Sequence, residues 1–376
     1  MVEESKDSEG NPPRRFPLSY CAGGYETLAR LENLYERRAA DQVCAVFEVR
    51  TAALERFEQA HPAGFCDYPD PNERIAFWDE HLAERSALLD DSVPCAYLSE
   101  FDQGLYGGLL GGEVRFLSDP GMGWISSMVP PLFDELSDAS KLTFDRDHPW
   151  FQCYLEQMDI FARGAAGKFG ISHLILIDSV NFVFELIGAT AAYQALIEQP
   201  EAVSRAIDFA FGFNVKIHEA FFDHVGLTEG GTCSNMIGWG PGRLVSESVD
   251  PFHMTSVDYF ERWGREPVER IFNRFDGGVL HIHANGRHLL EAVSTLPGLK
   301  GIWLGDDRGY EPSFDILGEL KRRVGDVPVI VSVNYDRFVR ALDNHALIGG
   351  IQYVVTNTPD ADAAHREMTR VRRYTF

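Results

Sequence analysis

The chain has 376 residues, 45% of them hydrophobic, and a formal net charge of −23. This length suits a barrel with added segments, and the apolar fraction is enough for a large core. A surface this acidic repels phosphate groups, and no stripe of Lys or Arg reverses the charge locally, which excludes nucleic acid and anionic membranes as expected partners.

The chain begins with a polar segment, MVEESKDSEGNPPRR, that contains no apolar stretch. We expect residues 1–16 to form a disordered tail rather than a secretion signal. No later segment reaches the length of a membrane span. The six cysteines form no C-x-x-C pair, which indicates reduced thiols rather than a disulfide scaffold. These features together predict a cytoplasmic protein.

Short apolar runs alternate with amphipathic stretches along the chain, a pattern typical of a parallel α/β architecture. Eight runs are candidate strands: Val43–Val49, Pro94–Leu98, Leu174–Ile177, Gly231–Asn235, Val279–His283, Ile302–Leu304, Val329–Val333 and Tyr353–Val355. Eight is the number that closes a (β/α)₈ barrel, so we predict one such TIM-barrel domain over residues 17–376. Glu113–Phe116 is predicted as a ninth strand outside the barrel.

The helices are predicted from apolar residues at helical spacing. They are Glu201–His224, Pro312–Arg323, Asp336–Leu342 and Asp360–Arg373. Pro71–Asp90 reads as an N-terminal helical extension, with Asp70 as its cap and Pro71 in its first turn. The segment 105–150 is rich in Gly and Pro, and we expect it to form a lid or rim over the barrel mouth.

Several candidate strands end in a polar residue where the following loop begins. Asp178 and the nearby Asn181 follow one strand, Asp306 follows another, and Asn334 ends a third. In a barrel, this end of the strands carries the active site. Each of these side chains could instead cap a helix or hydrogen-bond to the barrel backbone.

The stretch Val279-Leu-His-Ile-His-Ala-Asn-Gly-Arg-His carries the most chemical information. Side chains alternate on a strand, so His281 and His283 point the same way, toward the barrel interior near its mouth. Two such imidazoles can share a zinc ion, which needs further ligands. Cys233, Asp306 and Glu100 are the options, and the sequence leaves them open. The two histidines could instead bind a substrate carboxylate.

The same stretch resembles the uroporphyrinogen decarboxylase superfamily, which includes that decarboxylase and the corrinoid- and coenzyme M-dependent methyltransferases. The resemblance runs from about Asp41 to the C-terminus and includes Ser99–Phe116, Gln199-Pro-Glu-Ala-Val and the closing Asn357-Thr-Pro. It implies a (β/α)₈ barrel and a small-molecule substrate.

In the methyltransferase branch, an H-x-C pair on this strand and a later Cys before the final T-P hold zinc. Here His281 matches the family His and His283 stands where the Cys would be, while the region around Gln352 has no Cys. The resemblance implies a zinc-dependent methyltransferase that moves a methyl group from a small methylated substrate to a corrinoid. A separate partner protein would carry the corrinoid. The resemblance also implies a homodimer.

Two alternatives stay open. The first is a metal-free, decarboxylase-like lyase for a carboxylated small molecule. Its arginine cluster is missing near Arg14-Arg15, which leaves Arg243 and Arg287 to bind carboxylates, and Asp102 lies where the family has a catalytic Asp. The second is a non-catalytic small-molecule binding protein.

The candidate site residues fall into three groups. We predict catalytic roles for Asp178, Asp306, Glu100 and Asp102, substrate binding by Asn181, Asn285, Asn334, Trp239 and Arg243, and metal ligation by His281, His283 and Cys233.

Overall fold

The computed structural model describes residues 16–376, apart from the side chains at positions 137, 138 and 140, so the predicted tail lies almost wholly outside the described residues. The central feature is a six-stranded, fully parallel sheet in the order β1-β13-β12-β11-β10-β9. Its strands are β1 (Val43–Val49), β9 (Val245–Ser248), β10 (Gly278–Ile282), β11 (Leu299–Leu304), β12 (Val329–Asn334) and β13 (Ile351–Thr358). Apolar residues dominate these strands because both faces of a parallel sheet are covered.

Two smaller sheets complete the strand set. One has the order β3-β6-β7-β8 and is formed by β3 (Cys95–Tyr97), β6 (Gly170–Ser172), β7 (Gly231–Ser234) and β8 (Gly238–Pro241). The other is antiparallel, in the order β2-β4-β5, and consists of β2 (Gly64–Cys66), β4 (Arg115–Asp119) and β5 (Trp124–Met128). The predicted strand outside the main sheet, Glu113–Phe116, overlaps β4.

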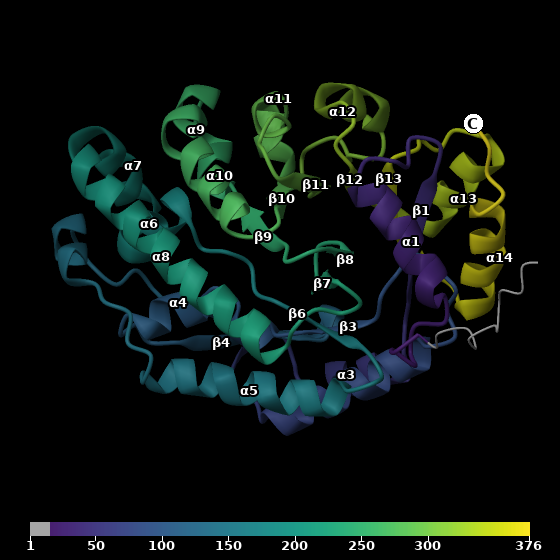
Figure 1. Ribbon diagram of the computed structural model, residues 1–376, viewed down its shortest axis with the longest axis horizontal. Coiled ribbons are helices and arrows are strands. Elements are labelled where there is room, and N and C mark those ends of the chain that lie inside the picture. Colours follow the sequence, from purple (N-terminus) through teal and green to yellow (C-terminus); the bar gives the residue numbers. More distant parts are fainter. Residues whose placement is uncertain (1–15) are drawn as a thin grey trace, which may run out of the picture.

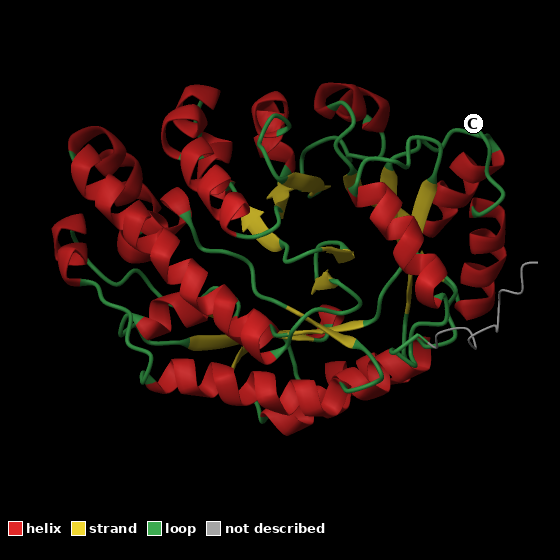
Figure 2. Ribbon diagram, viewed as in Figure 1, coloured by secondary structure: helices red, strands yellow, loops and turns green. Residues whose placement is uncertain are grey.

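The helices surround the strands (Figure 1), and Figure 2 shows helices on the outside and strands on the inside. They are α1 (Gly24–Tyr35), α2 (Ala52–Ala60), α3 (Pro71–Arg85), α4 (Gly104–Leu109), α5 (Pro149–Ala165), α6 (Ser179–Ile187), α7 (Ala189–Glu198), α8 (Pro200–His224), α9 (Val257–Trp263), α10 (Arg265–Arg274), α11 (Leu290–Val293), α12 (Leu317–Val324), α13 (Tyr335–Asp343) and α14 (Ala361–Val371). In the described part of the chain, no single helix is long and apolar enough to cross a membrane.

The predicted helices are confirmed, three of them within two residues of their predicted bounds and two with one end shifted by five residues. Asp70 caps α3 by accepting a hydrogen bond from the Asn72 amide, and Pro71 occupies the first turn. The helix ends at Arg85 rather than at Asp90. The predicted helix Pro312–Arg323 begins only at Leu317, because the preceding residues form turns.

Regular strand pairing stops at two places, which we call seams: between β9 and β6, and between β1 and β3. On one side, Ile175 bridges to Ser246 of β9 in parallel fashion. On the other side, the amides of Ala45 and Phe47 donate to the carboxylates of Asp91 and Asp90, at 3.0 and 2.8 Å. A continuously hydrogen-bonded, closed barrel is therefore not confirmed. The structure is a mixed α/β fold with a mostly parallel central sheet.

The predicted barrel strand Gly231–Asn235 has a different role. It forms β7, which turns back and pairs antiparallel with β8. This hairpin lies within the arc of strands (Figure 1) and shares a hydrophobic cluster with α1, β10 and β12. Its place next to β10 is taken by β9. The predicted strand Leu174–Ile177 is shifted as well, since β6 ends at Ser172.

Candidate functional site

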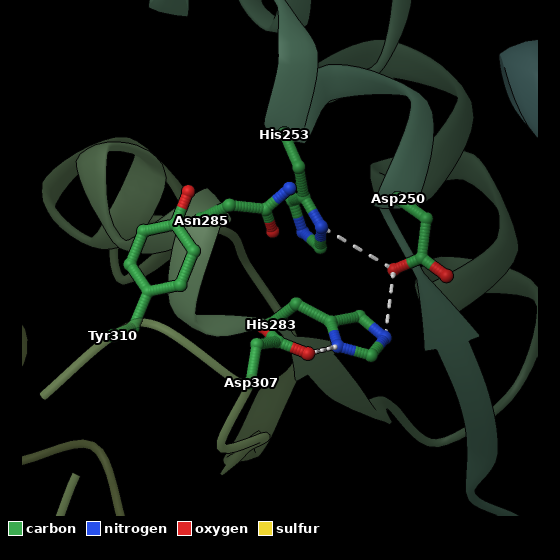
Figure 3. A pocket seen from close by; sticks show the side chains of 6 residues that line it. All are labelled: Asp250, His253, His283, Asn285, Asp307 and Tyr310. Carbon is green, nitrogen blue, oxygen red and sulfur yellow. Dashed lines mark hydrogen bonds and ion pairs between the residues drawn. The ribbon is translucent and has the colours of Figure 1, made fainter. Parts of the chain in front are cut away.

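A pocket of about 320 Å³ opens where three neighbouring strands, β9, β10 and β11, end (Figure 3). The residues that line it are Asp250, His253, His283, Asn285, Asp307 and Tyr310. The first two lie in the 3₁₀ helix η4 (Asp250–Met254) after β9, the next two follow β10, and the last two follow β11. The carboxyl ends of parallel strands are where such folds place their ligand sites.

The two histidines of the H-x-H motif lie side by side, with ring centroids 4.5 Å apart. Nδ1 of His283 donates to Oδ1 of Asp307 at 2.9 Å, and Nδ1 of His281 donates to the carbonyl of Trp303 at 3.2 Å. Because both acceptors lack a proton, each ring carries its hydrogen on Nδ1. The Nε2 atoms of both rings are thereby left as lone-pair donors.

Gly305 makes room for this arrangement. A Cβ atom at this position would come within 3.0 Å of Cε1 of His281 and 3.4 Å of Nδ1 of His283. The amide of Ala284 also donates to Oδ2 of Asp307, at 2.7 Å, which fixes the carboxylate that holds His283. The strand ends and the loop after β11 therefore orient the two rings together.

Asp250 is the carboxylate that faces the histidines across the pocket (Figure 3). Its Oδ1 lies 3.5 Å from Nδ1 of His253 and 4.0 Å from Nε2 of His283. The side chain of Asp250 is 46% exposed, whereas that of His253 is almost fully buried. Nε2 of His253 has no partner among the described residues. The ring packs against Gly286, where a Cβ would lie only 2.1 Å from it.

Burial sets the charge of the imidazoles. Burial lowers the pKa of His253 to about 4, and burial together with His283 lowers the pKa of His281. Both rings are neutral at pH 7 and available as nitrogen ligands. For Asp307, burial acts to raise the pKa, but the hydrogen bonds from His283 and Ala284 outweigh it and the pKa is lowered.

Within residues 16–376 no three His, Cys, Asp or Glu side chains are already arranged to hold a metal ion. The pair His281 and His283 nevertheless has the features of metal-binding histidines, since Nδ1 is hydrogen-bonded to an oxygen and Nε2 is free. His283 lines the pocket, with the Asp250 carboxylate 4.0 Å from its Nε2, whereas His281 lies beside His283 and is not among the lining residues.

Cys233 does not join this pair. Cys233 pairs with Ser172, which lies three residues before Ile175. Ile175 and Val279 both pair with Ser246, so they lie at the same level of the sheet. His281 lies two residues beyond Val279. The separation along the strands is therefore five residues, roughly 15 Å. The Cys233 thiol instead contacts the Thr228 hydroxyl at 3.7 Å in the buried hairpin.

Two predicted catalytic carboxylates hold local structure. Asp178 caps α6 through the Ser179 amide and is buried. Asp306 accepts hydrogen bonds from the Ser313 amide and from Nη2 of Arg287, at 2.7 and 3.3 Å. Neither lines the pocket.

The other two catalytic candidates lie after β3. Glu100 is fully buried, forms an ion pair with Nε of Arg74 and accepts from Gln157 at 2.8 Å. For Asp102, burial raises the pKa to about 6, and one carboxylate oxygen has no hydrogen-bond partner among the described residues. Neither residue lines the pocket at the ends of β9 to β11.

Of the predicted substrate-binding residues, only Asn285 lines the pocket, and its Nδ2 donates to Sδ of Met254 at 3.7 Å. Asn181 donates to the Ser248 carbonyl and Asn334 caps α13. Trp239 and Arg243 belong to the opposite end of the strands. Trp239 is buried in the β7–β8 hairpin, and Arg243 precedes β9, where its amide donates to Asp276.

Sequence reasoning missed Asp250 and His253. Both follow β9, whose sequence Val-Ser-Glu-Ser has no apolar run that would mark it as a strand. The signal available was Asp250-Pro251-Phe252-His253 itself, an acid and a histidine at i and i+3 on one face of a helical turn.

Comparison with known proteins supports the fold alone. The chain matches no protein-family model and no curated protein. Among solved structures it resembles a methyltransferase from Methanosarcina mazei, with a TM-score of 0.59 and 13% identity. The alignment covers 93% of this chain and 98% of that one. At this identity the likeness concerns architecture, and function has to be argued from the site.

Proposed function

We propose that this protein is a zinc-dependent methyltransferase that moves a methyl group from a small methylated substrate to a corrinoid on a partner protein. The observation that carries the proposal is the fixed tautomer of His281 and His283. Both rings use Nδ1 for a hydrogen bond and leave Nε2 free, 4.5 Å apart by ring centroid. The likeness of fold to a methyltransferase adds support.

In this proposal the Nε2 atoms of His281 and His283 hold the zinc ion. When bound, zinc acts as a Lewis acid that polarises a substrate oxygen or lowers the pKa of a bound nucleophile. Asp307 keeps the His283 ring in place and neutralises part of the local charge. Tyr310, which is 52% exposed at the rim, and Asn285 would orient the substrate.

We further propose that the parallel strands form a (β/α)₈ barrel with two non-standard seams. The strands in ring order are β1, β3, β6, β9, β10, β11, β12 and β13. The Ile175–Ser246 bridge and the Asp90 and Asp91 side chains stand where ladder hydrogen bonds would otherwise close the ring. The histidine pocket then lies at the mouth, as in barrel enzymes generally.

A metal-free lyase is less well supported by this pocket. Such a lyase needs cationic groups for a substrate carboxylate, and the pocket lining contains no Lys or Arg. Arg287 is engaged with the Glu311 carbonyl, the Ser313 hydroxyl and Asp306. Arg243 lies near the opposite ends of the strands.

The first experiment is elemental analysis of the purified protein beside the double variant His281→Ala/His283→Ala. We expect close to one zinc per chain in the parent and none in the variant. Methyl transfer is then followed from the absorption change as reduced cob(I)alamin becomes methylcobalamin in the presence of methanol, methyl ethers or methylamines, with and without zinc. A parent that binds no zinc even after zinc is added, or a zinc-loaded parent that forms no methylcobalamin from any of these donors, would contradict the proposal.

A further inference from the structure

We infer that Asp250 is the third protein ligand of the metal site, which makes the ligand set two histidines and one carboxylate. This inference rests on the metal site of the proposed function. Asp250 faces His253 and His283 across the pocket, with Oδ1 at 4.0 Å from Nε2 of His283 and 3.5 Å from Nδ1 of His253 (Figure 3). The free nitrogen of His283 therefore points toward this oxygen.

The distance between Oδ1 of Asp250 and Nε2 of His283 is only slightly longer than the distance between two ligands of one zinc ion. Zinc–ligand bonds of about 2.0–2.1 Å at a tetrahedral angle separate two ligand atoms by about 3.4 Å. Oδ1 of Asp250 and Nε2 of His283 need to approach by only about 0.6 Å from the observed 4.0 Å. Asp250 is half exposed and forms no side-chain hydrogen bond with the described residues, so it is free to make this movement.

The other carboxylates and the thiol considered for this role are committed elsewhere. Asp306 holds Ser313 and Arg287, and Glu100 holds Arg74. Cys233 lies about 15 Å away along the strands. The two carboxylate oxygens of Asp307 accept hydrogen bonds from His283 and from the Ala284 amide. Among these side chains, only Asp250 lies near the free Nε2 of His283 without a hydrogen bond to another described residue.

His253 supports Asp250 from behind. Its side chain is 3% exposed and is held over Gly286, so it cannot swing toward solvent without a rearrangement of the loop. Nδ1 is the edge that faces Asp250, while Nε2 is buried without a partner among the described residues. Burial of the His253 ring beside Asp250 is explained if its Nδ1 donates a hydrogen bond to Asp250 and so orients this carboxylate toward the metal.

This ligand set has a chemical consequence. Two imidazoles and one carboxylate, with no thiolate, form a harder site than one built on cysteine and leave coordination positions open. Such a site favours an oxygen of the substrate as the next ligand. The substrate class that follows is a compound with an oxygen-bound methyl group, such as a methyl ether or methanol, rather than a thiol.

Cobalt(II) is a suitable probe because its absorption spectrum reports the ligands directly. The full-length protein is titrated with cobalt(II), and the spectrum is recorded for the parent and for Asp250→Ala, Asp250→Glu, Cys233→Ala and Asp258→Ala. Asp258 is an exposed carboxylate a few residues further along the same segment and serves as the matched control. Circular dichroism checks that each variant is folded.

We expect ligand-field bands without a thiolate-to-cobalt charge-transfer band in the parent. Asp250→Ala should weaken cobalt binding by about 100-fold or more, since loss of a group that only hydrogen-bonds to a ligand already costs about 10- to 100-fold. Asp250→Glu should recover part of the affinity, and the other two variants should bind like the parent. A charge-transfer band, a parent that binds no cobalt, or parent-like binding by Asp250→Ala would overturn the inference.

The methylcobalamin assay separates this outcome from that of the proposed function. Cobalt binding that depends on Asp250 without any methyl transfer would leave the metal site standing and remove the methyltransferase. Methyl transfer by a protein whose metal binding is unaffected in Asp250→Ala would leave the methyltransferase standing and remove Asp250 as a ligand.

Discussion

The carboxylate of Asp307 decides which nitrogen of His283 carries the proton. Its Oδ1 accepts from Nδ1 of His283, and its Oδ2 accepts from the Ala284 amide. Replacing Asp307 with Ala frees the ring to rotate or to change tautomer. We expect zinc affinity to fall by about 10- to 100-fold.

Competition with a zinc-binding dye measures this change in affinity. Asp258→Ala, which removes an exposed carboxylate from the segment after η4, should leave the affinity unchanged. An Asp307→Ala variant with parent-like affinity would show that the hydrogen bond does not position the ligand.

The substitution Gly286→Ala tests the packing of the pocket independently of any metal. A methyl group here would lie 2.1 Å from the His253 ring, so Gly286→Ala must displace that ring or the backbone. We expect a loss of about 1–3 kcal/mol in the free energy of unfolding, measured by urea denaturation. An added Cβ at Gly212 in α8 would stand in open space, and Gly212→Ala should stabilise the protein by roughly 0.5–1 kcal/mol. Equal effects of the two substitutions would contradict the tight contact.

At the level of elements, α6 and β9 meet at two buried carboxyl groups. Asp178 caps α6, and Glu247 is the third residue of β9. Burial raises the pKa of Asp178 to about 7, and burial together with Asp178 raises the pKa of Glu247 well above its usual range. Both oxygens of Glu247 and one of Asp178 have no hydrogen-bond partner among the described residues.

These groups predict how stability depends on pH. A carboxyl group with a raised pKa binds its proton more tightly in the folded state, so its contribution is present below the unfolded pKa of about 4. That contribution is lost as the pH rises toward 7 and beyond. Asp178→Asn removes the titration while keeping an oxygen that can cap α6.

The measurement is the free energy of unfolding at pH 5 and pH 8, for the parent and for Asp178→Asn. We expect the parent to lose more stability than the variant between these values, by a few kcal/mol at most. A variant that loses as much stability as the parent would show that Asp178 is ionised in the folded protein at both values.

For the whole molecule, the sequence predicts the strands whose apolar runs are continuous. Val43–Val49 is observed with the same bounds as β1, and β11 to β13 include the predicted runs. The pairing of His281 with His283 could also be predicted, because the two-residue period of a strand is a local property. These features depend on residues close together in the chain.

Features that depend on tertiary contacts were missed or misassigned. Residues 231–235 contain a strand, but its partner is its own neighbour β8, and sequence periodicity does not identify partners. The polar strand β9 is stabilised by β10 and by Ile175 rather than by its own apolar side chains. Because β9 was missed, Asp250 and His253, which follow it, were missed as well.

In the proposed barrel, side chains close the strand ring at the seam between β1 and β3. Oδ2 of Asp91 accepts from the Ala45 amide at 3.0 Å, and the same carboxylate pairs with Arg30, whose side chain is 17% exposed. Asp91→Ala leaves a buried amide without an acceptor and a largely buried guanidinium without its partner. We expect it to cost about 3–5 kcal/mol of the free energy of unfolding. Asp326→Ala, which breaks a partly exposed pair with Arg37, should cost less than about 1 kcal/mol.

Amide hydrogen exchange locates the effect of Asp91→Ala within the molecule. If the carboxylates close the ring, the Ala45 and Phe47 amides should exchange much faster in the variant. Amides in the centre of the six-stranded sheet, such as that of Ile330 on β12, should change only as far as the global stability falls. A uniform acceleration across all strands would show that the seam opens only with the whole molecule, and unchanged exchange at Ala45 would show that Asp91 does not close the ring.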